Sequence, residues 1–248
     1  MREPEERFEA ARRAMMAEIE AEVVETGRWL GKERLDPRVL DALARVPRHR
    51  FAPAALQEAA YDNQPLPIGH GQTISQPYIV AVMSDLAALG PADKVLEVGT
   101  GCGYQAAVLA ELAGRVISLE TVPALAESAA ARLRELGYRN VEVRQADGAR
   151  GWPAEAPYDA IVVTAAAEGR IPPALIAQLA PGGRLVIPVD YGAPRGFWRL
   201  GRERDQQLLL VVKQPDGEIA ERRVLPVAFV PLIEQNTEPV ETQETSQR

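Results

Sequence analysis

Three glycines at alternate positions stand where a predicted β-strand gives way to a predicted helix. Gly99, Gly101 and Gly103 occur in the segment EVGTGCGYQ, between the β-rich run KVLEVG and the helical stretch that begins at Tyr104. Glycine lets a backbone turn tightly and approach a ligand closely, and in this strand–turn–helix context such a motif indicates a nucleotide-binding loop. A plain connector between strand and helix is the alternative explanation.

The spacing of the glycines separates two classes of nucleotide-binding protein. The dinucleotide fingerprint is G-x-G-x-x-G, whereas here the third glycine is Gly103 and position 104 is Tyr. The pattern Glu97-x-Gly99-x-Gly101-x-Gly103 is similar to that of S-adenosylmethionine-dependent methyltransferases, which disfavours a nicotinamide-dependent oxidoreductase. Glu97 can attract a sulfonium and an amino group, directly or through water, or can hold the backbone amides of the loop.

Acidic residues end the next two predicted strands. Glu120 closes the run VISLE, where a carboxylate can accept both ribose hydroxyls of an adenosyl ligand. Asp147-Gly148 closes the following run, where a short acidic side chain can accept a hydrogen bond from the adenine amino group. An exposed strand-end charge and a common Asp-Gly turn are the alternatives. Three such features at the carboxyl ends of successive strands favour a ligand site at that edge of the sheet.

A hydroxyl-rich segment, GHGQTISQPYIVAVM at 69–83, precedes the glycine loop. Its two glycines are typical of a loop that covers a ligand site. Ser75 comes shortly before Pro77 and a predicted helix, so its local context alone favours a helix N-cap or a turn residue. Cys102 has glycines on both sides and no adjacent base, so we expect it to fill space rather than to act as a nucleophile.

An amphipathic helix is predicted over residues 5–25. Phe8, Met15, Ile19 and Val23 recur near the helical period with charged residues between them. We expect this helix to serve in packing.

Two further features precede the strands. A second helix begins at Asp36-Pro37, a capping residue followed by proline at the first helical position, and ends at Pro47. Prolines and glycines interrupt residues 51–77, which predicts a long irregular segment whose apolar residues keep it ordered.

From residue 78 onward, β-rich runs alternate with helical stretches, which predicts a doubly wound parallel sheet with helices on both faces. The β-rich runs are 94–99, 116–120, 141–147, 159–165 and 184–189. Residues 206–232 predict two further strands joined through the turn Pro215-Asp216-Gly217.

Composition disfavours several broad classes of protein. Acidic residues outnumber basic ones, 35 to 28, and the formal net charge of -7 predicts no broad attraction for nucleic acid or anionic lipid. Cys102 is the only cysteine, so an internal disulfide and a thiolate metal site are excluded, and we expect no metal. The N-terminus lacks a signal-like apolar run and no segment has membrane-spanning length, so we expect a cytoplasmic protein without membrane contact.

Several blocks of the sequence, taken in order, resemble the protein-L-isoaspartate (D-aspartate) O-methyltransferase family. The resemblance spans roughly residues 36–232 and includes VLDALARVPRHRF, YDNQPLPIGHGQTISQPYIVAVM, VLEVGTGCGYQAAVLA, DGARGW, APYDAIVVTAAAEGRIPPALIAQLAPGGRLVIPV and FVPL. GQTISQP is its specific element, because other methyltransferases share the glycine block and not this one. The resemblance implies methylation of the α-carboxylate of L-isoaspartyl residues in damaged proteins, with S-adenosyl-L-methionine as cofactor. The product would then form a succinimide, which allows a return to the normal aspartyl linkage.

The resemblance also implies roles for individual residues. Ser75 takes the place of the family's active-site serine, while Thr73 and Ile74 lie where cofactor and substrate meet. The cofactor-binding positions are Glu97, Gly99, Thr100, Gly101, Gly103, Glu120, Asp147 and Gly148, with Glu120 at the ribose and Asp147-Gly148 at the adenine edge. A carboxylate acceptor is already ionised at neutral pH, so we expect Ser75 to orient it rather than to activate it.

These observations together predict one α/β domain with a Rossmann-like class I methyltransferase fold. Residues 1–77 would form N-terminal helices and the active-site loop, and 78–233 the cofactor-binding core with antiparallel C-terminal strands. The polar tail 234–248 has no periodicity and is expected to be disordered. The alternatives are a methyltransferase of the same fold that acts on a small molecule or nucleic acid, and a cofactor-binding module without catalysis.

Overall fold

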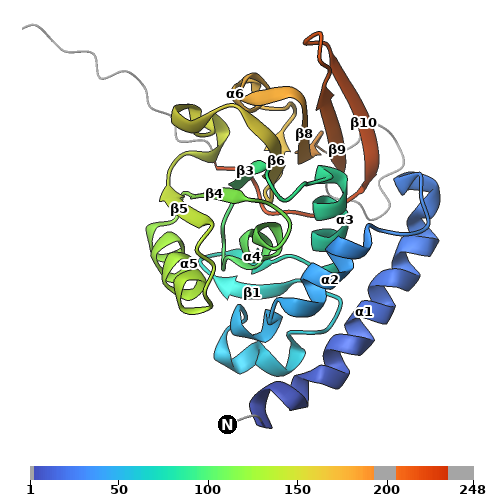
Figure 1. The fold of residues 1–248 in the computed structure, drawn as a ribbon, viewed down its shortest axis with the longest axis vertical. Helices are drawn as coiled ribbons and strands as arrows, with labels where there is room; N and C mark the ends of the chain where they lie inside the picture. The colour runs from blue at the N-terminus through green and yellow to red at the C-terminus, as the bar shows by residue number, and fades with distance from the viewer. Residues whose placement is uncertain (1–2, 193–204, 234–248) are drawn as a thin grey trace, which may run out of the picture.

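A mainly parallel sheet of eight strands crosses the computed structural model, which describes residues 3–192 and 205–233 (Figure 1). The strand order is β10-β9-β8-β6-β3-β4-β5, and β7 pairs with β8 outside this path. The strands are β3 (Lys94–Val98), β4 (Arg115–Glu120), β5 (Val141–Gln145), β6 (Tyr158–Val163), β7 (Ala167–Glu168), β8 (Leu179–Asp190), β9 (Gln206–Lys213) and β10 (Ile219–Pro226).

The direction of the strands confirms the predicted topology. β3 pairs in parallel with β4 on one side and with β6 on the other, so the order of the strands reverses at β3. β9 is antiparallel to both β8 and β10, which confirms the predicted C-terminal hairpin. In open α/β sheets, ligands bind at the carboxyl ends of the strands beside such a reversal. The loops after β3 and β4 therefore hold the favoured position for a site.

Side chains alternate between the two faces of the sheet and form two buried clusters. On β3, Val95 belongs to the cluster on one face, while Leu96 and Val98 belong to the other. The first cluster includes residues of α1–α4, and the second includes Leu175 of α6. These helices are α1 (Glu3–Leu30), α2 (Pro37–Arg45), α3 (Pro77–Ala87), α4 (Tyr104–Ala110) and α6 (Pro173–Ala177); α5 (Pro123–Glu135) packs along β4 and β5.

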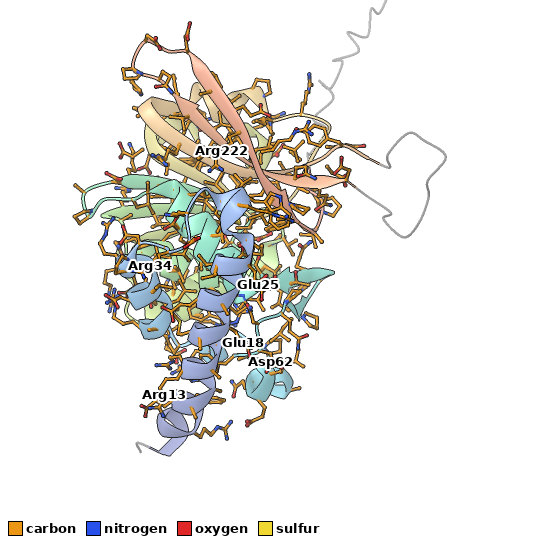
Figure 2. The ribbon with its side chains drawn as sticks, turned by 90° about the vertical axis from the view of Figure 1, so that its right-hand side faces the viewer. Arg13, Glu18, Glu25, Arg34, Asp62 and Arg222 are labelled. Atoms are coloured by element: carbon orange, nitrogen blue, oxygen red, sulfur yellow. The ribbon has the colours of Figure 1, made fainter. Side chains whose placement is uncertain are left out.

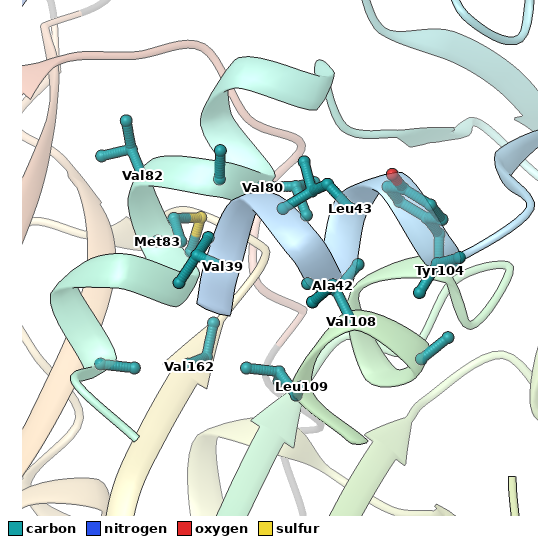
Figure 3. Close-up of a cluster of buried hydrophobic side chains, with 14 of the residues drawn as sticks. Val39, Ala42, Leu43, Val80, Val82, Met83, Tyr104, Val108, Leu109 and Val162 are labelled. Carbon is teal, nitrogen blue, oxygen red and sulfur yellow. The ribbon is translucent and has the colours of Figure 1, made fainter. Parts of the chain in front are cut away.

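Figure 3 shows the centre of the first cluster. Val39 of α2 lies beside Met83 of α3, Leu43 of α2 lies beside Val80 of α3, and Val108 of α4 belongs to the same cluster. The packed core therefore holds α3 and α4, the two helices that follow the candidate loops.

The start of α2 confirms the predicted cap, because the Asp36 side chain accepts a hydrogen bond from the Arg38 amide at 2.9 Å.

The N-terminal helix α1 is longer than the predicted 5–25 and reaches Leu30. The four predicted core residues, Phe8, Met15, Ile19 and Val23, are all buried, as their spacing indicated. Figure 2 shows α1 along one side of the molecule, with the exposed Arg13, Glu18 and Glu25 along it.

The end of α1 lies against the C-terminal hairpin. The Arg222 guanidinium of β10 donates to the Trp29 carbonyl oxygen at 3.0 Å (Figure 2). Segments from opposite ends of the chain thus meet on one side of the molecule.

The segment 51–77 is more regular than the sequence predicted. It contains the 3₁₀ turn η2 (Ala54–Ala59) and a hairpin of β1 (Leu66–Gly69) and β2 (Gln72–Ile74), and it is preceded by the 3₁₀ turn η1 (Arg48–Arg50). Gly69, His70 and Gly71 reverse the chain with φ values of 88°, 54° and 71°. Strands of three or four residues are too short to show the alternation of apolar and polar residues that identifies a strand. The glycines and prolines of this segment therefore predicted irregular structure instead.

Two further 3₁₀ turns follow β5: η3 (Gly148–Arg150) and η4 (Pro153–Glu155).

Within residues 3–192 and 205–233, no helix has both the length and the apolar character that crossing a membrane requires. The tail 234–248, for which the sequence predicts disorder, lies outside the described residues.

Candidate active site

A cavity of about 670 Å³ lies at the carboxyl ends of β3, β4 and β6, in the size range of small-molecule sites. The structure brings most of the sequence-predicted site residues to its wall: Thr73, Ile74, Ser75, Gly99, Thr100, Gly101, Glu120 and Gly148. Glu97, Gly103 and Asp147 do not line it. Two segments that are distant in the sequence, the hydroxyl-rich loop and the glycine loop, therefore line a single cavity.

Gly99 leaves room that no other residue would leave. Its φ is +98°, and a Cβ atom built on it would lie 2.3 Å from Thr164 Oγ1. The Thr164 hydroxyl donates to the Gly99 carbonyl oxygen at 2.6 Å, and the amides of Gly99 and Thr100 donate to the Leu119 carbonyl at 2.8 and 3.0 Å. The loop after β3 is thus fixed to the ends of β4 and β6.

The Glu120 carboxylate joins the ends of β3 and β4. Oε2 accepts a hydrogen bond from the Gly101 amide at 2.8 Å, and Oε1 accepts one from the Val122 amide at 2.9 Å. The residue is only 6% exposed, yet it lines the cavity. An ionised carboxylate has about four acceptor sites, so it retains capacity for a hydroxyl donor in the cavity.

Glu97 lies behind the loop and is completely buried. The parallel register places Glu97 of β3 beside Ser118 of β4, whose hydroxyl donates to Oε2; the Thr100 and Ser118 hydroxyl oxygens are 2.5 Å apart. Burial raises the pKa of Glu97 to about 8. Its contacts therefore run through Ser118 to Thr100 rather than to the backbone amides of the loop, and Oε1 has no hydrogen-bond partner among the described residues.

Gly103 and Asp147 support the loops from outside the cavity. A Cβ atom on Gly103 would lie 3.2 Å from Leu133 Cδ1, so this glycine permits α4 and α5 to pack closely. Asp147 caps η3, because its Oδ1 accepts from the Ala149 amide at 3.0 Å. Gly148 faces Val98, whose Cγ1 would be 2.3 Å from a Cβ atom at this position.

Ser75 is not the N-cap that its position before Pro77 suggested. Gln76 is the N-cap of α3 and makes no capping hydrogen bond with its side chain, while the Tyr78 amide in the first turn donates to Asn63 Oδ1 at 3.0 Å. Ser75 is half-buried at the cavity wall, between the buried Ile74 and the N-terminus of α3. Its hydroxyl is therefore not required for the start of the helix.

The sequence analysis missed a polar group that α1 contributes to the cavity. Glu22 and Thr26 line it, although this helix was expected only to pack. Glu22 Oε2 accepts from Asn63 Nδ2 at 2.8 Å and from Gln76 Nε2 at 3.2 Å, and burial raises its pKa. The four-residue spacing of Glu22 and Thr26 along one helix face was visible, but the sequence does not show what that face meets.

The C-terminal segment 225–233 forms a further part of the wall that was not predicted. The Gln206 side chain binds its backbone, because Oε1 accepts from the Phe229 amide at 2.6 Å and Nε2 donates to the Phe229 carbonyl at 3.2 Å. The Ala166 amide donates to the Val230 carbonyl, and the Leu232 amide donates to the Ala166 carbonyl, both at 2.8 Å. The sequence block FVPL in this segment contributed to the family resemblance, but it did not indicate that these residues line the cavity.

Comparison with known sequences identifies relatives that share nearly the whole length. The sequence model of the family described as protein-L-isoaspartate(D-aspartate) O-methyltransferase (PCMT) matches residues 22–237. Protein-L-isoaspartate O-methyltransferase 2 of Syntrophobacter fumaroxidans is 57% identical over 225 residues, which are 91% of this chain and 87% of that protein. The protein of the same name from Polaromonas sp. is 57% identical over 218 residues, 88% of this chain and 98% of that one.

Solved structures show the same fold. A protein-L-isoaspartate O-methyltransferase has a TM-score of 0.72 at 25% identity, over 89% of this chain and 65% of that chain. A beta-aspartate methyltransferase (PCMT) from Plasmodium falciparum in complex with S-adenosyl-L-homocysteine has a TM-score of 0.66 at 25% identity, over 86% of this chain and 97% of that chain.

Proposed function

This chain belongs to the protein-L-isoaspartate (D-aspartate) O-methyltransferase family, and we propose how its own residues divide the work of that activity. The enzyme uses S-adenosyl-L-methionine to methylate isoaspartyl residues in damaged proteins, which initiates their repair. When bound, this cofactor supplies an electrophilic methyl group. The residues of the cavity have to bind it, orient the acceptor carboxylate and exclude water.

We assign the cofactor to the end of the cavity formed by the glycine loop. The residues present fit such a group: Gly99 lets the loop lie directly against Thr164, where a Cβ atom would collide, and the buried Glu120 can accept from ribose hydroxyls. Gly101 and Thr100 complete this wall. Glu97 would act indirectly, because it holds Ser118 and through it the Thr100 hydroxyl.

The remaining predicted residues flank that end of the cavity. Gly148 would face the adenine edge, with Asp147 fixing the turn that presents it. Gly103 would allow the loop to lie close to α5. Thr73 and Ile74 would line the junction of cofactor and acceptor.

Ser75 would orient the isoaspartyl carboxylate. Because a carboxylate is ionised at neutral pH, no strong base is needed to activate it. Alignment of reactants and exclusion of bulk solvent can lower a barrier by roughly 7 to 11 kcal/mol, and a fixed hydroxyl donor contributes to that alignment. The single observation that carries this assignment is that Ser75 and the glycine loop line the same cavity.

The decisive experiment compares two peptides that differ only at one linkage. The enzyme is incubated with adenosylmethionine labelled in the methyl group and with a peptide that contains either isoaspartyl or normal aspartyl at the same site. We expect label in the isoaspartyl peptide alone. Equal labelling of both peptides, or of neither, would contradict the assignment, and binding of adenosylmethionine without any transfer would favour a module without catalysis.

We also propose a cytoplasmic location, no nucleic-acid partner and a single compact domain. The single cysteine supports the location. The net charge of -7 argues against a nucleic-acid substrate. The buried cluster that joins α1–α4 to the sheet supports one domain over residues 1–77 and 78–233.

A further inference from the structure

We propose that Arg48 is a positioning residue for methyl transfer, because it holds the backbone of Ser75 from outside the cavity. Arg48 does not line the cavity and has no exposed surface. The inference rests on the proposed role of Ser75, since a residue that fixes Ser75 matters for the reaction only if Ser75 does.

The guanidinium binds carbonyl groups of separate segments. Nη2 donates to the Ser75 carbonyl oxygen at 2.7 Å, and Nε donates to the Ala60 carbonyl oxygen at 2.7 Å. Ala60 follows η2, whereas Ser75 follows β2. The planar guanidinium has a fixed arrangement of donors, so it sets the Ser75 carbonyl at a defined place relative to η2.

The same guanidinium also contacts the cofactor side of the site. Its central carbon lies 4.6 Å from the centroid of the Tyr104 ring, which is labelled in Figure 3. Tyr104 is the first residue of α4 and comes directly after Gly103, the N-cap of that helix. One side chain thus contacts both the segment that carries Ser75 and the helix that follows the glycine loop.

This burial has a cost that the contacts must offset. Arg48 forms no ion pair with any described residue, and burial lowers the pKa of its guanidinium. An unpaired buried charge costs several kcal/mol, which an apolar side chain of similar size would avoid. Arg50, two residues later, instead forms an exposed ion pair with Glu135 at 2.5 Å. The distinctive contribution of Arg48 is therefore the set of carbonyl groups and the ring that it holds in place.

The test uses Arg48→Lys and Arg48→Gln in the full-length enzyme. Lysine keeps the charge but lacks the planar fork, and glutamine removes the charge but keeps one planar donor group. For both variants we expect kcat with an isoaspartyl peptide to fall by roughly fivefold to tenfold, as for loss of the Ser75 hydroxyl, because a misplaced positioning group slows the reaction. The dissociation constant of S-adenosylhomocysteine, measured by calorimetry, should change by less than about twofold. The same titration counts binding-competent sites, so kcat is expressed per folded enzyme.

Two matched controls separate positioning from stability. His49→Gln disturbs a buried neighbour in the same 3₁₀ turn, whose ring contacts Tyr61 and stacks on Phe8. Arg50→Lys makes the same chemical change as Arg48→Lys at the surface. We expect His49→Gln to lower Tm with kcat retained, and Arg50→Lys to change neither. The proposal is overturned if kcat per folded enzyme is unchanged in both Arg48 variants, or if affinity for S-adenosylhomocysteine falls in proportion to kcat. If Ser75→Ala itself leaves methyl transfer unchanged, the role of Ser75 fails first, and that outcome is distinct from a failure of Arg48 alone.

Discussion

The two ends of the cavity are held in place by different kinds of contact. At the glycine-loop end, Gly101 and Glu120 are nineteen residues apart; Gly101 lies in the loop after β3, and Glu120 is the last residue of the neighbouring parallel strand β4. At the Ser75 end, the loop is held by Arg48, 27 residues away, and by Glu22, which binds Gln76 across 54 residues. The first end is built from adjacent strand ends, and the second is assembled from α1, η1 and the hairpin β1–β2.

This difference suggests a division of function that substitutions can test. If the two ends act separately, changes at the glycine-loop end should weaken cofactor binding, whereas changes at Ser75 should slow methyl transfer and leave cofactor binding intact. A Ser75 variant that loses cofactor affinity, or a glycine-loop variant that keeps it, would contradict this division.

The largest effect is expected from Gly99→Ala. The alanine Cβ would lie 2.3 Å from Thr164 Oγ1 in a backbone with φ of +98°, so either the loop moves or the Thr164 hydroxyl gives up its bond to the Gly99 carbonyl. We expect affinity for S-adenosylhomocysteine to fall by roughly 100-fold, about 2.7 kcal/mol, in isothermal calorimetry. Gly137→Ala is the control, because Gly137 has φ of +89° with open space around it and should lose only stability. Binding within about tenfold of wild type in Gly99→Ala would contradict the assignment of this loop.

Glu120→Gln is expected to have the next largest effect. It replaces a carboxylate that accepts from the Gly101 and Val122 amides with a group that has one acceptor oxygen. Hydrogen bonds to charged groups contribute about 1.5 to 3 kcal/mol, so affinity for S-adenosylhomocysteine should fall by roughly 10-fold to 100-fold. The exposed Glu127→Gln on α5 should behave as wild type. Unchanged affinity in Glu120→Gln would show that the carboxylate serves only the backbone of the loop.

Ser75→Ala tests the other end of the cavity. A hydroxyl that orients the acceptor should contribute about 1 to 1.4 kcal/mol, so kcat should fall by roughly fivefold to tenfold. Affinity for S-adenosylhomocysteine should stay within about twofold of wild type. In the exposed control Ser128→Ala, both kcat and this affinity should stay within the same range. Loss of cofactor affinity in Ser75→Ala would mean that the two ends do not act separately.

The smallest effect on cofactor binding and methyl transfer is expected from Glu97→Gln, which should change the stability of the fold instead. Burial raises the pKa of Glu97 from 4.5 to about 8, so between these pH values the folded protein retains a proton that the unfolded chain has released. This contribution to stability is complete at low pH and is lost as pH rises toward 8. Glutamine stays neutral and keeps an oxygen for Ser118, so the free energy of unfolding of the variant relative to wild type should rise by roughly 3 kcal/mol between about pH 5.5 and pH 8. Urea denaturation at the two pH values measures this; parallel curves would show that Glu97 is ionised in the folded state.

The glycine-loop end was largely predictable because its determinants are local. Strand β3 reads as a short β-rich run that ends in glycine, and the positive φ values of Gly99, Gly101 and Gly103 are conformations that glycine adopts at little cost. Asp36 was equally visible, since a capping side chain acts within its own turn. Such features depend on residues within a few positions of one another.

The Ser75 end was only partly predictable. The family resemblance indicated Ser75, but the local pattern favoured a helix cap, and the structure places Gln76 at that position. The Arg48 sequence context, RVPRHR, does not distinguish a buried arginine from an exposed one. The difference between Arg48 and Arg50 comes from which carbonyl groups the fold brings within reach.

The sequence by itself determined the parallel alternation of strands and helices, the glycine loop and the acidic residues at the strand ends. Each of these follows from short-range rules of backbone conformation and side-chain period. Only the tertiary structure decided that Ser118 lies beside Glu97, that α1 lines the cavity through Glu22, and that Arg48 binds the Ser75 carbonyl. These contacts join residues separated by tens of positions, and their formation depends on strand register and helix packing, which no local pattern encodes.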